Sequence, residues 1–353
     1  MRRNKIHTWF FLGNGIGSFL CALNTVETVW FSIPKERRGK CIILVTRDEG
    51  LFRELSAMYP HVEVISVNLK NIPTLASIFF NTIIDTHYAL HPISFGEHNT
   101  FFKLYSRFIT FWNRESQNVG AVKDTWINRI VYSKIVARDL SISVFEMEER
   151  MAESIMHINK KNIEILFQFD TSLQKHLSVP YIVIHPYAAN VGRSLPVDRW
   201  VGILEFIHTA FPQLQIIISG SPSDRLPYHE MQTLTTVPTT FIQDITHGSI
   251  QKMYQILSGS MLFIGVDTGI THVANMLHKD CIVIGNRSNP CWLPTYNDKA
   301  IILTNAERCI CGGDKTGGCF VYIEEVRYYR CMIDIAQETI YETITNKLRV
   351  IKQ

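Results

Sequence analysis

The sequence predicts an α/β protein of two Rossmann-like domains joined by a mostly helical bridge. The chain has 353 residues, and because domains usually contain about 100–200 residues, two are expected. Two stretches of the chain alternate short apolar strands with helices. Strands separated by helices form parallel sheets with helices on both faces. A hydrophobic fraction of 46% and a charged fraction of 19% provide a full core for each domain.

The first alternating series predicts an N-terminal domain over residues 1–175, with the helical bridge included. Helices are expected at 18–30 and 51–58, and strands at 7–12, 41–46, 62–67 and within 77–85. From 97 to 177 the pattern becomes mostly helical, with aromatic residues at helical spacing: Phe101, Phe102, Tyr105, Phe108, Phe111 and Trp112. We interpret this aromatic stripe as core packing rather than as a ligand box.

The second series predicts a C-terminal domain over residues 178–335. Helices are expected at 197–209, 228–234, 250–257 and 270–277, and strands at 181–185, 215–219, 240–243, 261–266 and 281–284. A last helix at 336–353 is expected to pack back on the N-terminal domain.

The composition excludes several classes of function. No stretch approaches the ~20 consecutive apolar residues that a membrane span needs. The net charge of +3 is too small to predict a nucleic-acid partner. The basic and apolar N-terminus looks like the start of a signal peptide, but Gly13, Gly15 and Gly17 interrupt it and no cleavage site follows. Eight cysteines, unevenly spaced, do not form a secreted disulfide framework, so a cytoplasmic location is expected.

The most informative motif is Asp267-Thr268-Gly269-x-x-His272, which follows a buried strand and begins a helix. Ligands of open α/β sheets bind at the carboxyl ends of strands, and the unpaired N–H groups of a helix start suit phosphate oxygens. Gly269 permits a close approach of the backbone, while Thr268 and His272 offer donors. A second interpretation stays open, in which Asp267 caps the helix and His272 is a satisfied surface residue. An aspartic protease is excluded because the second Asp-Thr-Gly is missing.

A second motif lies in the polar loop after the strand at 181–185. The loop runs His185-Pro-Tyr-Ala-Ala-Asn-Val-Gly-Arg193 and leads into a helix. A guanidinium at position 193 matches phosphate oxygens in a bidentate manner. The alternative is an ordinary loop, with Arg199 and Trp200 packing on the helix.

Both segments resemble motifs of the lipopolysaccharide heptosyltransferase family, glycosyltransferase family 9. The loop resembles its "HPGA…K-x-W-P-x-x-x-W" segment, and residues 265–274 resemble its "DTG-x-x-H-x-A" segment, in the same order and at similar spacing. The resemblance is good over 180–335 and weak over 1–175. It implies a GT-B fold, with two domains facing each other across a cleft. It further implies an acceptor in the N-terminal domain and an ADP-sugar in the C-terminal domain.

The resemblance also implies a mechanism and roles for single residues. Arg193 takes the place of the family's phosphate-binding lysine, and Thr268, Gly269 and His272 hold the diphosphate. Asp267 shapes the turn or contacts the sugar. Transfer would be inverting and metal-independent, in agreement with the lack of an Asp-x-Asp pair. Fixed donors would stabilise the charge that develops on the leaving ADP.

The N-terminal glycine loop departs from the family pattern. Members carry "G-x-x-G-D" with the aspartate as general base, whereas this chain has Gly13-Asn-Gly15-Ile-Gly17-Ser18. A serine hydroxyl does not accept a proton as a carboxylate does. Other candidates for the base are Glu27, Asp85, His87, Glu97 and His98. A dinucleotide site at this loop is disfavoured because no acidic residue clearly ends the second strand.

Four cysteines cluster near the C-terminus: Cys309, Cys311, Cys319 and Cys331. Four thiolates suit one tetrahedral zinc or iron ion, although one residue between the first pair is unusually tight. Family members carry a similar "C-x-x-C…C…CM-x-x-I" stretch, and in some protein-modifying relatives it binds iron. A structural metal and reduced thiols or a disulfide stay open as alternatives. No cofactor is expected to be required for catalysis.

The leading expectation is an enzyme that moves heptose, or a related sugar, from an ADP-sugar to a hydroxyl of the lipopolysaccharide core. It would act at the cytoplasmic face of the inner membrane, with peripheral contact through basic and aromatic N-terminal residues. A second hypothesis replaces the acceptor by a protein serine, as in autotransporter-modifying relatives. A third treats the chain as a degenerate transferase that only binds the nucleotide-sugar, because Ser18 replaces the base.

Overall fold

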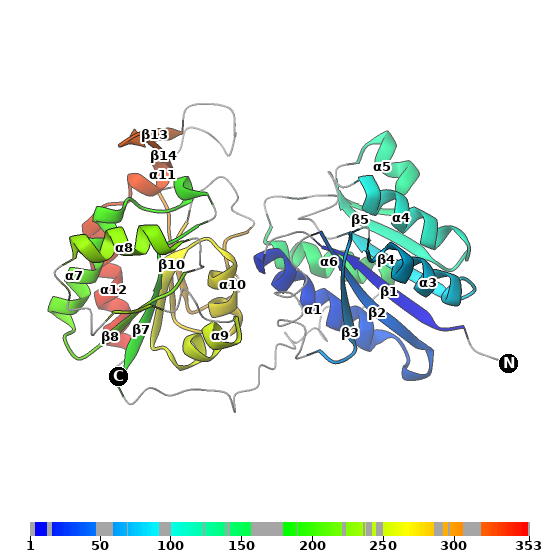
Figure 1. Ribbon diagram of the computed structural model, residues 1–353, viewed down its shortest axis with the longest axis horizontal. Coiled ribbons are helices and arrows are strands. Elements are labelled where there is room, and N and C mark those ends of the chain that lie inside the picture. The colour runs from blue at the N-terminus through cyan, green and yellow to red at the C-terminus, as the bar shows by residue number, and fades with distance from the viewer. Residues whose placement is uncertain are drawn as a thin grey trace. The chain divides into compact units, whose positions relative to one another are not determined.

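The computed structural model describes residues 4–12, 16–46, 59–68, 70–91, 100–122, 124–137, 139, 142–156, 179–188, 190–220, 224–235, 237, 242–244, 250–285, 292–295, 297–305 and 319–351. The chain divides into two compact units, Met1–Phe167 and Gln168–Gln353 (Figure 1). The domain limit predicted at 175–178 lies outside the described residues. None of the helices that the structure describes is long and apolar enough to cross a bilayer.

The N-terminal unit is built on a parallel sheet of six strands in the order β3-β2-β1-β4-β5-β6. The strands are β1 (Ile6–Phe11), β2 (Arg38–Val45), β3 (Val62–Ser66), β4 (Thr86–His91), β5 (Gln117–Val122) and β6 (Lys134–Ala137). The winding reverses between β1 and β4, which pair directly with each other. In doubly wound sheets, ligands bind beyond the carboxyl ends of the two strands at such a switch point.

Helices cover both faces of this sheet (Figure 1). They are α1 (Ile16–Ser32), the short η1 (Lys35–Arg37), α3 (Ile72–Thr82), α4 (Thr100–Phe111), α5 (Trp126–Val131) and α6 (Val144–Met156). Two predictions for this unit are wrong. The strand expected within 77–85 is the end of α3, which has a proline in its first turn, a position that favours a helix start. The helical bridge expected from 97 onward contains β5 and β6.

The aromatic stripe is only partly a core feature. Phe102 is 1% exposed and packs in the core over the sheet. In contrast Phe101, Phe108, Phe111 and Trp112 are 41–67% exposed. Interpretation of the whole stripe as core packing was therefore wrong, because only one side of α4 lies on the sheet.

The C-terminal unit repeats the same winding in a second parallel sheet, in the order β12-β11-β10-β7-β8-β9. The strands are β7 (Tyr181–His185), β8 (Gln215–Ile218), β9 (Ile242–Asp244), β10 (Leu262–Val266), β11 (Cys281–Ile284) and β12 (Ala300–Leu303). The switch point lies between β7 and β10, the two strands that carry the motifs. A separate antiparallel hairpin consists of β13 (Phe320–Ile323) and β14 (Val326–Tyr329).

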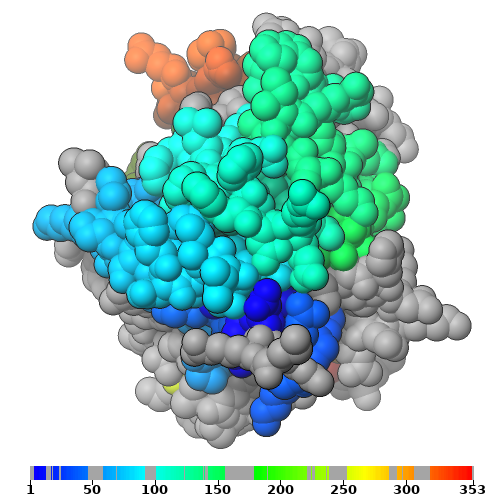
Figure 2. Space-filling view, turned by 90° about the vertical axis from the view of Figure 1, so that its right-hand side faces the viewer, coloured from blue at the N-terminus to red at the C-terminus, as the bar shows by residue number. Residues whose placement is uncertain are grey.

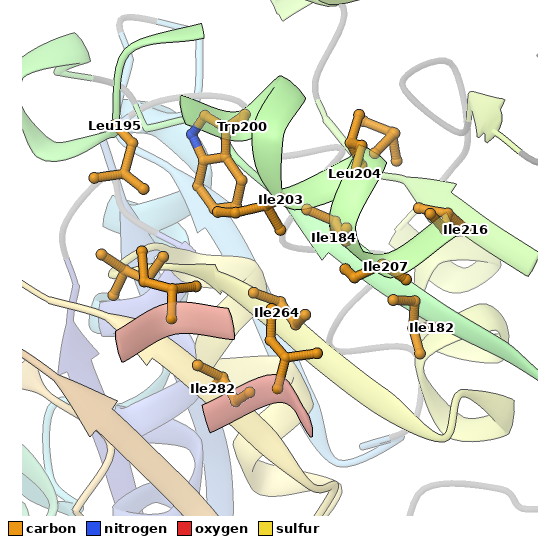
Figure 3. Packing of buried hydrophobic residues seen from close by; sticks show 14 of the residues in the cluster. Ile182, Ile184, Leu195, Trp200, Ile203, Leu204, Ile207, Ile216, Ile264 and Ile282 are labelled. Carbon is orange, nitrogen blue, oxygen red and sulfur yellow. The ribbon is translucent and has the colours of Figure 1, made fainter. Parts of the chain in front are cut away.

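The helices of this unit enclose a large apolar core. They are η4 (Val191–Arg193), α7 (Val197–Ala210), α8 (Arg225–Leu234), α9 (Ile250–Gly259), α10 (Gly269–Met276), α11 (Arg330–Ile333) and α12 (Gln337–Ile351). Trp200 and Ile203 of α7 belong to the same buried cluster as Ile184 of β7 and Ile264 of β10 (Figure 3). This packing fixes the start of α7, and with it the loop that precedes the helix.

The C-terminal helix α12 packs in the C-terminal unit. Its apolar stripe, Ile340, Ile344 and Leu348, is fully buried in the core of that unit. The Arg199 guanidinium donates to the carbonyls of Ile333 and Ile335 and so holds the chain just before the helix. That this segment also packs back on the N-terminal domain stays a prediction, because the two units are described separately. A stripe at helical spacing predicts burial but does not name the surface that receives it.

Candidate functional site

The two motifs of the C-terminal unit meet at the carboxyl ends of β7 and β10. These strands pair in parallel, and Gly265 lies opposite His185 at their ends. A side chain at position 265 would come within 3.1 Å of the His185 carbonyl oxygen, so glycine allows the two strand ends to approach. The loop after β7 and the turn after β10 therefore start from neighbouring points, as the switch-point rule requires.

Arg193 and Asp267 form an ion pair at this point. The Arg193 Nη2 donates to the Asp267 carboxylate and, at 3.1 Å, to the Asp267 carbonyl oxygen. The carboxylate side chain is 5% exposed, so its charge is balanced mainly by the guanidinium. The buried Arg193 Nε–H has no acceptor among the described residues. The structure thus brings the two motifs into direct contact.

The turn before α10 does not follow the simple capping interpretation. Thr268, not Asp267, stands at the N-cap, with extended backbone angles (φ −144°, ψ 173°) and no side-chain bond to the helix. Its hydroxyl lies 3.3 Å from that of Thr271. Because Asp267 faces Arg193 instead, no cap side chain accepts from the first N–H groups of α10. Such groups attract anionic oxygens.

His272 lies in the first turn of α10 and is buried, with 2% of its surface exposed. The interpretation as a surface histidine was therefore wrong. Burial lowers the pKa of the imidazole, against the opposing influence of Asp267, whose Oδ1 lies 3.9 Å from Nε2. A neutral imidazole retains one N–H donor. Trp292, which the sequence analysis did not consider, lies edge-on to this ring at 6.4 Å.

Local hydrogen bonds hold the Arg193 loop in place. The Asn190 side chain caps η4 by accepting from the Gly192 N–H at 3.0 Å. The Ser194 hydroxyl donates to the Pro186 carbonyl, and Trp200 Nε1 donates to the same hydroxyl at 3.3 Å. Trp200 and Arg199 pack on the helix as the alternative expected, but they also support the loop. Arg193 is consequently presented from a well-anchored segment.

At the switch point of the N-terminal unit, Gly17 and Ser18 lie in the first turn of α1. Gly13 and Gly15 lie outside the described residues, and so do Glu97 and His98. Glu27 lies further along α1, is buried, and forms a 2.6 Å ion pair with His61. Its carboxylate therefore pairs with His61 at a distance from the start of the helix, where the base is expected.

Asp85 and His87 lie at the amino end of β4, at the edge of the sheet opposite to the glycine loop. Asp85 accepts from the backbone N–H of Lys5 and bonds the His7 ring, both at 3.1 Å. The two ring nitrogens of His87 bond Trp9 Nε1 and the Thr82 carbonyl at 3.0 Å each. The structure brings neither residue to the carboxyl ends of the strands, and each has partners that give it a structural role.

His91 is the residue at this switch point that the sequence analysis missed. It ends β4 next to β1, is fully buried, and stacks on Phe11 with ring centroids 4.3 Å apart and planes 2° apart. Neither ring nitrogen has a hydrogen-bond partner among the residues that the structure describes. Burial lowers its pKa to about 3, with Lys103 adding to the effect. A sequence signal exists: His-Pro follows a strand both at 91–92 and at 185–186, once at each switch point.

We predict that the N-terminal unit loses stability in acid through its buried histidines. Burial lowers the pKa of His87 to about 4 and of His91 to about 3, whereas the unfolded chain keeps the ordinary value of 6.5. Below 6.5 the unfolded state therefore binds more protons, and the free energy of unfolding falls as the pH drops toward 4. Each histidine contributes about 1.4 kcal/mol per pH unit in this window and nothing above it.

Urea unfolding at several pH values measures this slope, and His91→Phe provides the matched test. Phenylalanine keeps the stacking on Phe11 but does not titrate. The free energy of unfolding should therefore fall less steeply with decreasing pH, by the contribution of one histidine. An unchanged slope in the variant would show that His91 is already protonated, or solvated, in the folded state.

The cysteine cluster is described only in part. Cys319 and Cys331 are both buried and flank the β13–β14 hairpin, whose ends are joined by the Arg330 N–H donating to the Cys319 carbonyl at 2.8 Å. Cys309 and Cys311 lie outside the described residues. Within the described ranges, no group of three or more histidine, cysteine or acidic residues is arranged to hold a metal. The four-cysteine metal site thus stays a prediction.

Comparison with known proteins points to one family. The sequence model of glycosyltransferase family 9 (heptosyltransferase) matches residues 101–316, more than half of the chain. A comparison with curated protein sequences finds no match.

Solved structures show the same fold at low sequence identity. E. coli ADP-heptose lipopolysaccharide heptosyltransferase II is 14% identical with a TM-score of 0.71, covering 99% of this chain and 100% of that chain. E. coli heptosyltransferase WaaC with ADP is 11% identical with a TM-score of 0.64, covering 97% and 99%. The dodecameric iron-containing heptosyltransferase TibC of E. coli, in complex with ADP-D-β-D-heptose, is 11% identical with a TM-score of 0.58, covering 99% and 78%. These matches confirm the predicted α/β fold of GT-B type.

Proposed function

The chain belongs to glycosyltransferase family 9, the heptosyltransferase family, and from this premise we propose that it transfers heptose, or a closely related sugar, from an ADP-sugar. The observation that carries the proposal is the contact of Arg193 with the Asp267 turn at the switch point of the C-terminal unit. The Arg193 guanidinium contacts the turn that leads into the uncapped start of α10, and both groups suit a diphosphate.

The proposed donor site acts by stabilising the leaving group. As the bond between sugar and phosphate breaks, negative charge grows on ADP. Arg193, the first N–H groups of α10 and the neutral His272 imidazole are donors fixed before the reaction, so they stabilise this charge without reorganising. Thr268 adds a hydroxyl at the same turn, and Gly269 keeps the backbone accessible. By resemblance to the family, we expect transfer to invert the sugar configuration and to require no metal ion.

We propose a hydroxyl of the lipopolysaccharide core as the acceptor, bound by the N-terminal unit. The proposal rests on the family and on the second switch point, where β1, the strand that precedes α1 in the chain, pairs with β4. The enzyme would act at the cytoplasmic face of the inner membrane, where the donor is available.

A panel of nucleotide-sugars, assayed by mass spectrometry with heptose-deficient lipopolysaccharide as acceptor, tests the function. We expect transfer from an ADP-heptose and equimolar release of ADP. Transfer only from uridine or guanosine derivatives would reject the proposed donor. ADP binding without any transfer would favour a degenerate nucleotide-sugar-binding protein, in which Ser18 reflects loss of the base.

A protein serine is the second acceptor to test. Cys319 and Cys331 lie at the two ends of one hairpin. This placement suits a structural metal ion such as the iron that similar cysteines bind in some protein-modifying members of the family. Supplying an autotransporter fragment in the same assay separates the two acceptors. Metal analysis of the purified protein tests the cysteine site independently of the acceptor. Zinc or iron at a near-stoichiometric level would establish that site.

We predict that Gly192→Ala weakens ADP binding about ten-fold or more, because loss of position at a binding loop is costly. A Cβ at this residue would lie 2.6 Å from the Arg327 carbonyl oxygen of β14, so either the hairpin or the neighbouring Arg193 must move. Calorimetric titration with ADP measures the effect. Val191→Ala is the control, because Val191 is 53% exposed in the same loop and should bind as the parent does. Equal affinity in both variants would mean that Arg193 is not held by this packing.

A further inference from the structure

The N-terminal unit exposes an unusual amount of apolar surface. Among the described residues, 18 large hydrophobic side chains are exposed, and 11 of them lie between positions 72 and 130. We call the following group the apolar face; its members are 44–73% exposed: Phe80, Leu104, Phe108, Phe111, Trp112 and Trp126. Figure 2 looks onto this part of the unit, where α3, α4 and α5 (cyan to green) form one surface. Scattered exposed residues need no explanation, but a concentration of this kind marks a contact surface.

The apolar face is continuous across three helices. Leu104, Phe108 and Phe111 follow the outer side of α4 at helical spacing, opposite to the buried Phe102. Phe108 contacts Phe79 of α3 with ring centroids 4.7 Å apart, and it lies edge-on to Trp112 at 5.9 Å. The helix α4 is therefore apolar on its outer side as well as on the side that rests on the sheet.

A hydrogen bond connects α5, the third helix of the apolar face, to α4. Lys103 Nζ of α4 donates to Asn128 Oδ1 of α5 at 3.2 Å, which holds the short helix beside α4. Trp126, at the start of α5, is 73% exposed, the largest value among the exposed apolar residues that the structure describes. The face thus ends in an indole ring that has little contact with its own chain.

Positive charge accompanies this apolar surface. Helix α4 contains Lys103 and Arg107 but no acidic residue. Arg107 and Arg114 are exposed and form no ion pair with any described residue. The nearby carboxylates are engaged instead: Asp124 accepts two 2.7 Å hydrogen bonds from Arg129, and Glu115 lies 3.6 Å from Arg37. Unbalanced cations beside the face are therefore available for an external anion.

We propose that the apolar face docks on a lipid bilayer that contains anionic lipids. Tryptophan and phenylalanine side chains favour the interface between headgroups and acyl chains, and adjacent arginines are attracted to anionic headgroups. This combination suits an anionic bilayer better than the same face of a second copy, because α4 has no acidic residue and would offer the two arginines no counter-charge. The inference rests on the proposed function only in that a lipid-linked acceptor gives the docking a purpose.

Vesicle flotation of the full chain tests the apolar part of the proposal. We expect the parent protein to float with vesicles of phosphatidylcholine and phosphatidylglycerol. The double variant Leu104→Ser/Phe111→Ser should bind these vesicles about ten-fold more weakly. Both side chains are more than 60% exposed, so the thermal midpoint should not fall. Tyr322→Ser is the control, since Tyr322 is equally exposed, at 68%, in the hairpin of the other unit.

Two further measurements test the charge and the location. Arg107→Gln/Arg114→Gln should weaken binding up to about 30-fold, at about 1 kcal/mol for each arginine, and make it less sensitive to salt. The chain has six tryptophans, of which Trp126 is the most exposed among those described. Trp112 also belongs to the apolar face. Tryptophan emission should shift to the blue on vesicles, and Trp112→Phe/Trp126→Phe should remove most of that shift.

The outcomes separate this proposal from the proposed function. Failure of the parent to bind anionic vesicles, or equal loss in the Tyr322→Ser control, overturns the docking proposal. A concentration-dependent dimer that the Leu104→Ser/Phe111→Ser variant abolishes would assign the face to a second copy instead. ADP affinity is measured in parallel: if it persists while vesicle binding fails, only the docking proposal is lost. If vesicle binding persists without ADP binding, the proposed function is lost.

Discussion

Arg193→Ala is expected to weaken ADP binding about 100-fold, because a charge-assisted hydrogen bond is lost and a buried charge is left unpaired. The guanidinium is the main counter-charge of Asp267, whose side chain is 5% exposed. Without it, the carboxylate would face the diphosphate of the donor directly. The loss therefore exceeds that of one phosphate contact, and the rate of sugar transfer should fall at least as far. Calorimetric titration with ADP and a coupled ADP-release assay measure both effects.

A double-mutant cycle distinguishes this electrostatic explanation from simple loss of a contact. In the Arg193→Ala background, Asp267→Asn removes the unpaired charge and keeps the side-chain shape, so about ten-fold of the lost affinity should return. Arg193→Lys keeps the charge but not the planar fork, and should bind ADP with intermediate affinity. If the two substitutions are strictly additive, Asp267 does not face the donor. If Arg193→Ala binds ADP normally, the diphosphate lies elsewhere.

Most strands of the C-terminal sheet and the first three of the N-terminal sheet could be predicted, because parallel strands buried on both faces are continuous apolar runs. Tyr181–His185 and Leu262–Val266 are of this kind. The misses have physical causes as well. The segment Gln117–Val122 contains Asn118 and Gly120, which weaken a strand signal, yet the close approach of the Tyr132 ring requires glycine there. The strand expected within 77–85 was placed too early in the chain. The apolar residues of α3 fit a strand as well as a helix when only their number is considered and not their spacing.

The candidate donor site could be predicted because its residues lie at strand ends. Chain order alone places the loop after β7 and the turn after β10 at neighbouring positions once the sheet is doubly wound. Which partner Asp267 takes could not be predicted, since a carboxylate before a helix serves equally well as a cap. The position of His91 depends on a strand that the sequence analysis did not assign. The exposure of Phe108 and Phe111 was also missed, because periodicity shows which residues share a face but not whether anything covers it.

Ser18→Asp is expected to raise the rate of sugar transfer about 100-fold, the lower end of the range that a positioned general base provides. Ser18 is the third residue of α1, and no acidic residue occupies the first turn of that helix. A carboxylate there is favoured by the helix macrodipole, so the substitution should be tolerated or slightly stabilising. By resemblance to the family, this is the position at which the base stands. Initial rates with saturating ADP-sugar and acceptor measure the effect.

Ser18→Asn is the control that isolates the proton transfer. Asparagine has nearly the same shape as aspartate and also favours a helix start, but its amide cannot take the proton of the acceptor hydroxyl. A gain with aspartate and none with asparagine would place the acceptor hydroxyl beside the start of α1. Equal rates in both variants would move the base away from this loop. His91 would then be the group to test by substitution, because its ring nitrogens bond no described residue and it lies at the carboxyl end of β4, stacked on Phe11 at the end of β1.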